Sequence, residues 1–137
     1  GRPVLVVPTG FNGTVGKKIL FAWNGSTESA RAISLAMPVM SNAESIEVLS
    51  VDGAMVPGPS SAEIAESLSR HDLKVTSQHA KPGTRTAGQT IVDTAIAVGA
   101  DLIVKGAYTQ SRLRQMIFGG MTRHLILHSP LPVLFSY

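Results

Sequence analysis

Short apolar runs that alternate with amphipathic segments restrict this chain to a small set of folds. Residues 18–23 (Lys-Ile-Leu-Phe-Ala-Trp) are apolar after the first position, which is typical of a strand buried on both faces of a sheet. Residues 24–26 (Asn-Gly-Ser) end this run, and apolar residues at helical spacing then predict a helix from Thr27 to about Pro38. The sequence therefore begins its main body with a strand, a tight turn and a helix.

The same alternation continues to the end of the chain. Residues 73–79 alternate apolar and polar side chains, which predicts a half-exposed strand at a sheet edge. Ser60 and Glu63 form a predicted capping box, and Gly99 marks the end of a helix. The remaining predicted strands are 45–51, 101–105 and 132–136, and the remaining helices begin near Ser60 and span about 86–98 and 120–128. Strands separated by helices of about this length predict an α/β fold, a doubly wound five-stranded parallel sheet with helices on both faces.

Composition narrows the function classes. A chain of 137 residues with 44% hydrophobic residues is expected to form one ordinary domain, and the absence of cysteine excludes disulfides and thiolate chemistry. The net charge of +3 is dispersed along the chain, so nucleic-acid binding is not predicted. No apolar run approaches the roughly 20 residues that cross a bilayer. We expect a soluble, cytoplasmic protein without a membrane partner.

A short repeat links the two ends of the sequence. Residues 2–7 (Arg-Pro-Val-Leu-Val-Val) resemble residues 131–136 (Leu-Pro-Val-Leu-Phe-Ser) at an offset of 129 positions. We interpret residues 1–8 as the final strand of a preceding, related unit and residues 9–16 as its linker, so the chain carries an extra N-terminal strand ahead of the domain formed by 17–137. The alternative is that Pro-Val-Leu is a common strand sequence and that the match is a coincidence.

Several segments together resemble a known family. Residues 18–26, 100–106, 119–123 and 128–134 are similar to those of a universal stress protein (UspA-like) domain, and the similarity covers residues 17–137. The resemblance implies the adenine nucleotide alpha hydrolase-like fold. It also implies a dimer, or a tandem pseudo-dimer within one chain, paired through the final strand, which here carries Val133, Leu134 and Phe135, together with the related strand Val4, Leu5 and Val6.

The family's nucleotide-binding members carry a glycine, two residues, a second glycine, nine residues, and then a glycine followed by serine or threonine. The matching positions here are Gly106, Thr109, Gly119 and Gly120, so the spacing is intact and two identities differ. Threonine adopts positive φ only with strain, and Gly120 lacks a hydroxyl whose hydrogen bond to a phosphate would be worth about 1.5–3 kcal/mol. Arg112 lies within the loop as a compensating cation.

The resemblance places the rest of the ligand at other strand ends. Asn24 stands where nucleotide binders usually have an aspartate near the ribose, and the neighbouring Gly25 joins it as a candidate ligand residue. The adenine would lie beside Val51, and Met121 would follow the phosphate loop. The expected ligand is ATP or AMP, bound without turnover by a sensor or adaptor of the stress response. The alternative is a structural or dimerisation unit whose phosphate loop has degenerated and binds no nucleotide.

Other candidate sites have simpler interpretations. His124 and His128 have the spacing of a metal-binding pair, but no further ligand accompanies them locally, and we predict no metal site. Ser26 is interpreted as a helix cap and not as a nucleophile. Asp52 is the carboxylate best placed for a metal-dependent hydrolase, the weakest of the three hypotheses.

Overall fold

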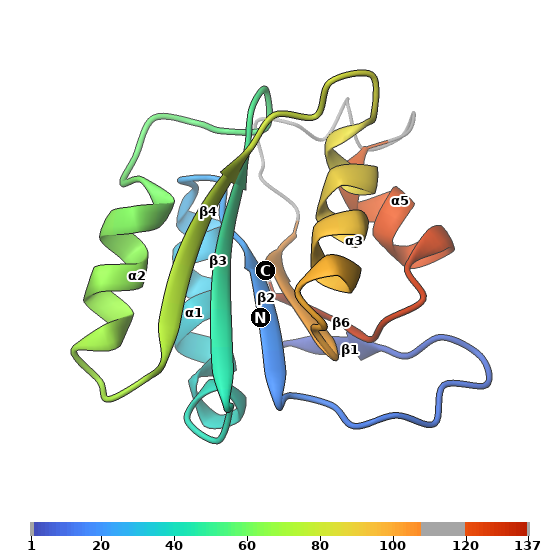
Figure 1. Cartoon of the computed structure of the whole chain (residues 1–137), viewed down its shortest axis with the longest axis horizontal. Coiled ribbons are helices and arrows are strands. Elements are labelled where there is room, and N and C mark those ends of the chain that lie inside the picture. Colours follow the sequence, from blue (N-terminus) through green and yellow to red (C-terminus); the bar gives the residue numbers. More distant parts are fainter. Residues whose placement is uncertain (1, 108–119, 137) are drawn as a thin grey trace.

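The computed structural model describes residues 2–107 and 120–136, which fold into one sheet between two layers of helices (Figure 1). Along the chain the elements are β1 (Val4–Val6), β2 (Lys18–Ala22), α1 (Thr27–Met40), β3 (Ser45–Val51), α2 (Ser61–Ser69), β4 (Val75–Ala80), α3 (Ala87–Ala97), β5 (Leu102–Gly106), α5 (Met121–His128) and β6 (Val133–Ser136). The predicted elements are all present, with ends that differ by one or two residues.

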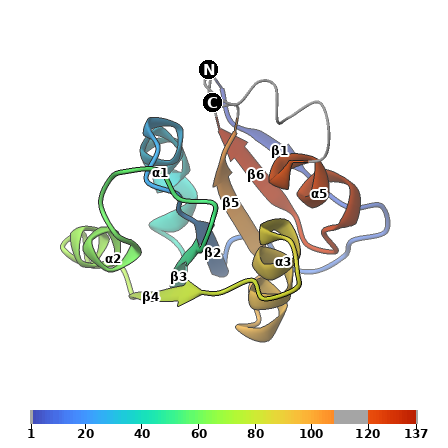
Figure 2. The same cartoon turned by 90° about the horizontal axis from the view of Figure 1, so that it is seen from above.

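The sheet has six strands in the order β1-β6-β5-β2-β3-β4. Strands β2 to β6 are parallel to one another, and β1 is antiparallel to β6. Seen from above, α1 and α2 cover one face and α3 and α5 cover the other (Figure 2). The doubly wound five-stranded parallel sheet with an extra N-terminal strand is confirmed, and the predicted edge strand, β4, lies at the edge.

Side-chain alternation along the strands divides the core in two. On β5, Leu102 and Val104 pack on the side of α1 and α2, whereas Ile103 packs on the side of α3 and α5. Each of these three side chains is no more than 1% exposed, as expected for a central parallel strand covered on both faces. The alternation places the side chain of the next residue, Lys105, on the α3 and α5 side.

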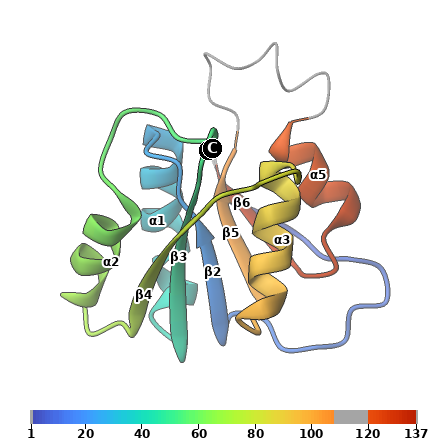
Figure 3. The same cartoon turned by 45° about the horizontal axis from the view of Figure 1, so that its top comes forward.

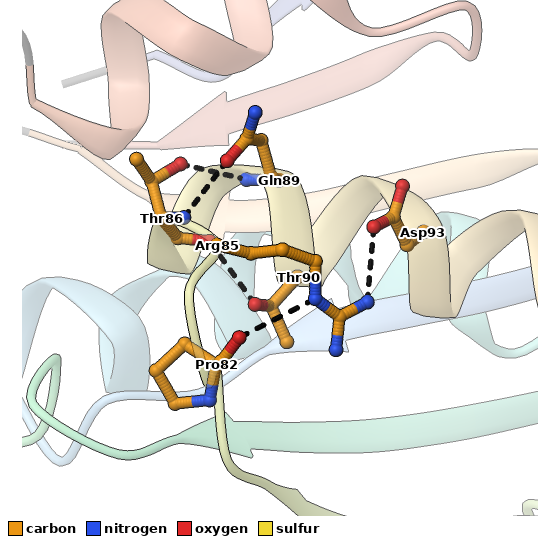
Figure 4. Close-up of polar contacts among 6 residues, drawn as sticks. All are labelled: Pro82, Arg85, Thr86, Gln89, Thr90 and Asp93. Atoms are coloured by element: carbon orange, nitrogen blue, oxygen red, sulfur yellow. Dashed lines mark hydrogen bonds and ion pairs between the residues drawn. The ribbon is translucent and has the colours of Figure 1, made fainter.

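Helix starts follow the local sequence signals. Ser60 and Glu63 form the predicted capping box, and the hydrogen bond from the Ser60 backbone N–H lowers the pKa of Glu63. Thr86 and Gln89 form a second box at the start of α3, and Figure 4 shows both of its hydrogen bonds beside the Arg85–Asp93 ion pair of 3.0 Å. The interpretation of Ser26 as a cap is confirmed, because its hydroxyl accepts from the backbone N–H of Ser29 at 3.2 Å.

The N-terminal segment, residues 2–17, is hydrogen-bonded to the rest of the domain at two places. Strand β1 pairs with β6 in the register Val4↔Phe135, Leu5↔Leu134 and Val6↔Val133. At the opposite end of the segment, the carboxylate of Asp101 accepts hydrogen bonds from the Thr14 hydroxyl at 2.8 Å and from the backbone N–H groups of Gly16, Lys17 and Lys18 at 2.9–3.1 Å. Asp101 therefore holds the linker against the amino end of β5.

The described helices give no sign of a membrane span. None of them in residues 2–107 or 120–136 is both long and apolar enough to cross a bilayer.

Candidate functional site

The carboxyl ends of β5, β2 and β3 lie side by side and point to the same end of the sheet (Figure 3). After β2, the chain adds β3 and β4 on one side of β2, and it then returns to add β5 and β6 on the other side. The strand order therefore reverses between β2 and β5. Doubly wound sheets bind ligands at this kind of position. Just beyond the end of β2, the backbone N–H of Trp23 donates to the Leu49 carbonyl of β3 at 2.8 Å, which extends the pairing of these two strands.

A small cavity lies under these strand ends, on the side of α3 and α5. Its volume is about 10 Å³, which holds about one water molecule. Three of the predicted ligand residues line it, namely Asn24, Val51 and Met121. The other lining residues among those described are Ala22, Trp23, Leu49, Ala54, Ile91 and Lys105.

Asn24 faces the first turn of α1 with its carbonyl oxygen. Its Oδ1 accepts hydrogen bonds from the Ser26 backbone N–H at 3.2 Å, from the Ser26 hydroxyl at 2.7 Å and from the Ser29 hydroxyl. The acceptor of the side chain is therefore engaged, and the amide N–H₂ group is the part left for a ligand. Towards a ribose hydroxyl, Asn24 would act as a donor only.

Gly25 lies against the loop between β3 and α2. Its φ of +84° favours glycine, and a Cβ atom there would lie 2.5 Å from the Val56 carbonyl oxygen. Gly58 approaches Gly25 as closely, because a Cβ atom added to Gly58 would lie 2.6 Å from the Gly25 carbonyl oxygen. The backbone N–H of Val56 donates to the Asn24 carbonyl at 2.8 Å. Gly25 thus allows this loop to pack over the end of β2.

Gly106 permits a close approach between β5 and α1. A Cβ atom there would lie 2.6 Å from the Ser29 nitrogen and 2.7 Å from the Glu28 carbonyl carbon, both backbone atoms. The φ of Gly106 is not positive. Within the described residues, the reason for glycine at this position is helix packing.

Gly120 is the N-cap of α5 and makes no side-chain hydrogen bond to the helix. Its φ of −70° is open to any residue, so a serine or threonine would fit this backbone. The first N–H groups of a helix have no partner within the helix and carry the positive end of its dipole. Met121 and Thr122 follow as the first two residues of α5.

The central part of the predicted phosphate loop is not placed. Thr109, Arg112 and Gly119 lie outside the described residues. The structure brings Asn24, Val51, Gly120 and Met121 to one end of the sheet, and it places Gly25 and Gly106 beside them as packing residues.

Lys105 is a further residue at this site, and it is not among the residues predicted from the sequence. Its Nζ donates to the Gly106 carbonyl at 2.7 Å and lies 3.5 Å from the Thr122 hydroxyl, while the residue is only 9% exposed. Desolvation lowers the pKa of its amine to about 8. The available signal was a lysine at the fourth position of a strand that is otherwise apolar and central, where a charged residue is rare.

Two side chains near the strand ends, Trp23 and Asp52, have hydrogen-bond partners within the domain. Trp23 is 3% exposed, packs with Phe21 and the α1 side of the core, and donates from Nε1 to the Pro59 carbonyl at 2.7 Å. The Asp52 carboxylate contacts His79 Nε2 at 2.7 Å, and the other ring nitrogen of His79 lies 2.9 Å from the Ser50 hydroxyl. Across residues 2–107 and 120–136, no group of three or more His, Asp or Glu side chains is arranged to hold a metal ion.

A parallel α/β sheet with a cavity at the point where its strand order reverses defines the doubly wound class of proteins. Within this class, the model of the universal stress protein family matches residues 16–136, and the chain belongs to that family. No curated protein sequence matches it significantly.

Solved structures with the same fold come from archaea, bacteria and plants. A universal stress protein from Archaeoglobus fulgidus superposes with a TM-score of 0.72 at 20% identity, over 98% of this chain and 49% of that protein. One from Burkholderia pseudomallei gives 0.63 at 19% identity, over 90% and 98% of the two chains. A family member from Arabidopsis thaliana, with AMP bound, gives 0.61 at 16% identity, over 88% and 90%. The chain thus spans about half of the Archaeoglobus protein, and at these identities the likeness shows the fold alone.

Proposed function

We propose that this domain binds an adenine nucleotide, ATP or AMP, at the carboxyl ends of β2, β3 and β5, and that it acts as a sensor or adaptor without turnover. The observation that carries the proposal is the meeting of these three strand ends, a lined cavity and the first turn of α5 at one place. A relative of the same fold from Arabidopsis thaliana has AMP bound, which supports this choice of ligand.

The described residues suit the two ends of a nucleotide differently. The phosphate end meets the N-terminus of α5 and the buried ammonium of Lys105, both of which attract an anion. The base end meets a cavity that holds about one water, so an adenine enters only if side chains at the rim move. Met121 is half-buried at this rim and is flexible enough to move aside.

The absence of turnover is part of the proposal. The carboxylate that the sequence placed best for metal-assisted hydrolysis, Asp52, contacts His79 on the edge strand. We expect no phosphate release from ATP above the rate of a heat-denatured sample. Release that is lost in the Asp52→Ala variant would contradict this part and support a hydrolase.

Calorimetric titration of the purified chain with ATP and AMP tests nucleotide binding, with Trp23 fluorescence as a second signal. We expect a micromolar dissociation constant. The Ala54→Leu variant fills the cavity and should weaken binding at least tenfold, because Ala54 lines it at 6% exposure. Ala97→Leu makes the same chemical change on the exposed side of α3 and is the matched control. No heat at millimolar ATP, or equal affinity in the Ala54→Leu variant, would contradict the proposal.

A second candidate function, that of an assembly unit, rests on the pairing of β1 with β6. The offset of 129 residues makes Leu5 the equivalent of Leu134, and these two residues are partners in the register. Val4 pairs with Phe135, the equivalent of Val6, and Val6 pairs with Val133, the equivalent of Val4. The two strands are therefore related by a pseudo-twofold axis. This symmetry supports the interpretation of residues 1–16 as the final strand and linker of a preceding related unit, in a tandem pseudo-dimer.

In the structure, β1 covers the edge of β6 through which such an assembly is expected to pair. The outer edge of β6 is occupied by β1, and Val133 and Phe135 are 1% and 6% exposed within the core, whereas Val4 is 59% and Leu5 47% exposed. Sedimentation equilibrium tests the pairing. We expect the full chain to be a monomer and a chain starting at Thr9 to dimerise through its uncovered β6 edge. A truncated chain that stays monomeric would overturn this role of β1.

A further inference from the structure

Two histidines of α5 lie next to each other, and one of them is in contact with α3. The ring centroids of His124 and His128 are 4.9 Å apart, and the rings are tilted by 44° to each other. His128 belongs to the last turn of α5 and is exposed, whereas His124 is half-buried. Two unit charges at such a separation interact directly, so a proton on one ring affects the other.

Gly88 allows His124 to lie directly on α3. A Cβ atom added to Gly88 would lie 2.8 Å from the Cβ and 2.9 Å from the Cγ of His124. Gly88 is buried in the first turn of α3, although glycine is a poorer helix former than alanine. The contact between the two helices therefore depends on the missing side chain at this position, and it removes water from one side of the His124 ring.

The charges around His124 do not favour a second proton on the pair. Desolvation lowers the pKa of His124 below its ordinary 6.5, the charge of His128 lowers it further, and Asp93 of α3 partly offsets both. The Asp93 carboxylate is itself paired with the Arg85 guanidinium at 3.0 Å, as Figure 4 shows. Among residues 2–107 and 120–136, the charged or titratable groups that act on His124 are thus His128 and Asp93, the latter shared with Arg85.

We propose that His124 and His128 form an acid-sensitive contact, in which protonation of both rings loosens the packing of α5 on α3. Neutral rings lie side by side without repulsion, whereas two imidazolium groups repel each other and the one nearby carboxylate already has a cationic partner. The same helix begins with Met121, which lines the cavity at the strand ends, so its displacement would also change that cavity. The inference does not depend on nucleotide binding.

The sign of the pH dependence follows from the direction of the pKa shift. Because the pKa of His124 is lowered in the folded protein, the unfolded chain binds the proton more readily. The contact is therefore fully stabilising above pH 6.5 and weakens as the pH falls below this value. Two unit charges about 5 Å apart in water repel enough to change an equilibrium constant about fivefold at low salt, which sets the expected size of the effect.

Nuclear magnetic resonance titration of the histidine rings tests whether the two side chains interact. The spectra are recorded from pH 4.5 to 8.5 at low salt, with EDTA present so that no metal ion bridges the rings. In the wild type His124 should titrate below pH 6.5. Its pKa should rise in His128→Gln and fall in Asp93→Asn. His71→Gln removes an exposed histidine that follows α2 and is the matched control, in which His124 should titrate as in the wild type.

Hydrogen exchange tests whether this interaction moves the helix. Protection of the amides of residues 124–128, corrected for intrinsic rates and taken relative to the central strand β5, is compared at pH 5 and pH 7.5. We expect it to fall about fivefold at pH 5 in the wild type and in His71→Gln, and to stay unchanged in His128→Gln. In 1 M NaCl most of the loss should disappear, because the screening length of about 3 Å is then shorter than the ring separation.

Each arm can overturn the proposal by itself. An unchanged pKa of His124 in His128→Gln would show that the rings do not interact. Protection of α5 that is equal at pH 5 and pH 7.5 would show that protonation leaves the helix in place. A loss of protection that is the same in His128→Gln as in the wild type would assign the acid sensitivity to other groups.

Discussion

Replacing Lys105 by methionine should make the ligand-free protein more stable, although it removes two polar contacts. Burial lowers the pKa of the amine from its ordinary 10.5 to about 8. At 1.36 kcal/mol per pKa unit, this corresponds to about 3 kcal/mol of destabilisation by the charged form at pH 7. The Gly106 carbonyl loses its ammonium partner in the variant, which costs about 1 kcal/mol. The net gain is about 2 kcal/mol.

The pH dependence provides a sharper test than the gain itself. Between pH 8 and 10.5 the folded wild type releases the Lys105 proton while the unfolded chain retains it. Stability rises with pH wherever the unfolded state binds more protons, so the wild type becomes more stable across this window. Lys105→Met has no such proton to release. The stability difference between the two proteins should therefore be full below pH 8 and should shrink until pH 10.5.

Urea unfolding followed by circular dichroism measures this difference at pH 7, 8, 9 and 10, without phosphate in the buffer. At pH 7 the variant should also melt about 8 °C higher, at about 4 °C per kcal/mol for a chain of this size. Lys18→Met, whose side chain is exposed, should match the wild type. A variant that is less stable at pH 7, or a difference that does not change up to pH 10, would refute the reasoning that the charge is desolvated.

Two further substitutions test contacts that position the site. Gly106→Ala should lower the free energy of unfolding by about 1–3 kcal/mol in urea titration, because the new Cβ would lie 2.6 Å from the backbone nitrogen of Ser29; unchanged stability would mean that α1 is free to shift away. Asp101→Ala should cost about 2–3 kcal/mol and increase hydrogen exchange at the amides of Gly16 and Lys17, which donate to this carboxylate; protection equal to the wild type would show that the linker is held by other contacts.

The sequence by itself determined the elements and their order. Capping boxes such as Ser60 with Glu63 involve residues three positions apart, so the start of α2 is determined locally. Continuous apolar runs mark strands covered on both faces, and the alternating run at β4 marks the edge. The order of strands and helices then leaves few topologies, because parallel connections are almost always right-handed.

The sequence also predicted that some of the candidate ligand residues lie at one end of the sheet. Ligands in doubly wound sheets bind at the carboxyl ends of strands, and the sequence alone predicts Asn24 and Val51 at such ends. Both line the cavity. The resemblance to the universal stress protein family, which the match over residues 16–136 confirms, added the phosphate loop.

Only the tertiary structure decided why particular residues are needed. Gly25 and Gly106 resemble ligand-binding glycines in the sequence, but each has a backbone segment from another element directly against it. The pairing of β1 with β6 and the hydrogen bonds from the linker to Asp101 join residues that are more than 80 positions apart. The burial of Lys105 depends in the same way on α3 and α5, which close over the end of β5. A sequence pattern records the neighbours of a residue along the chain, whereas close approach, desolvation and charge pairing depend on what lies across from it in space.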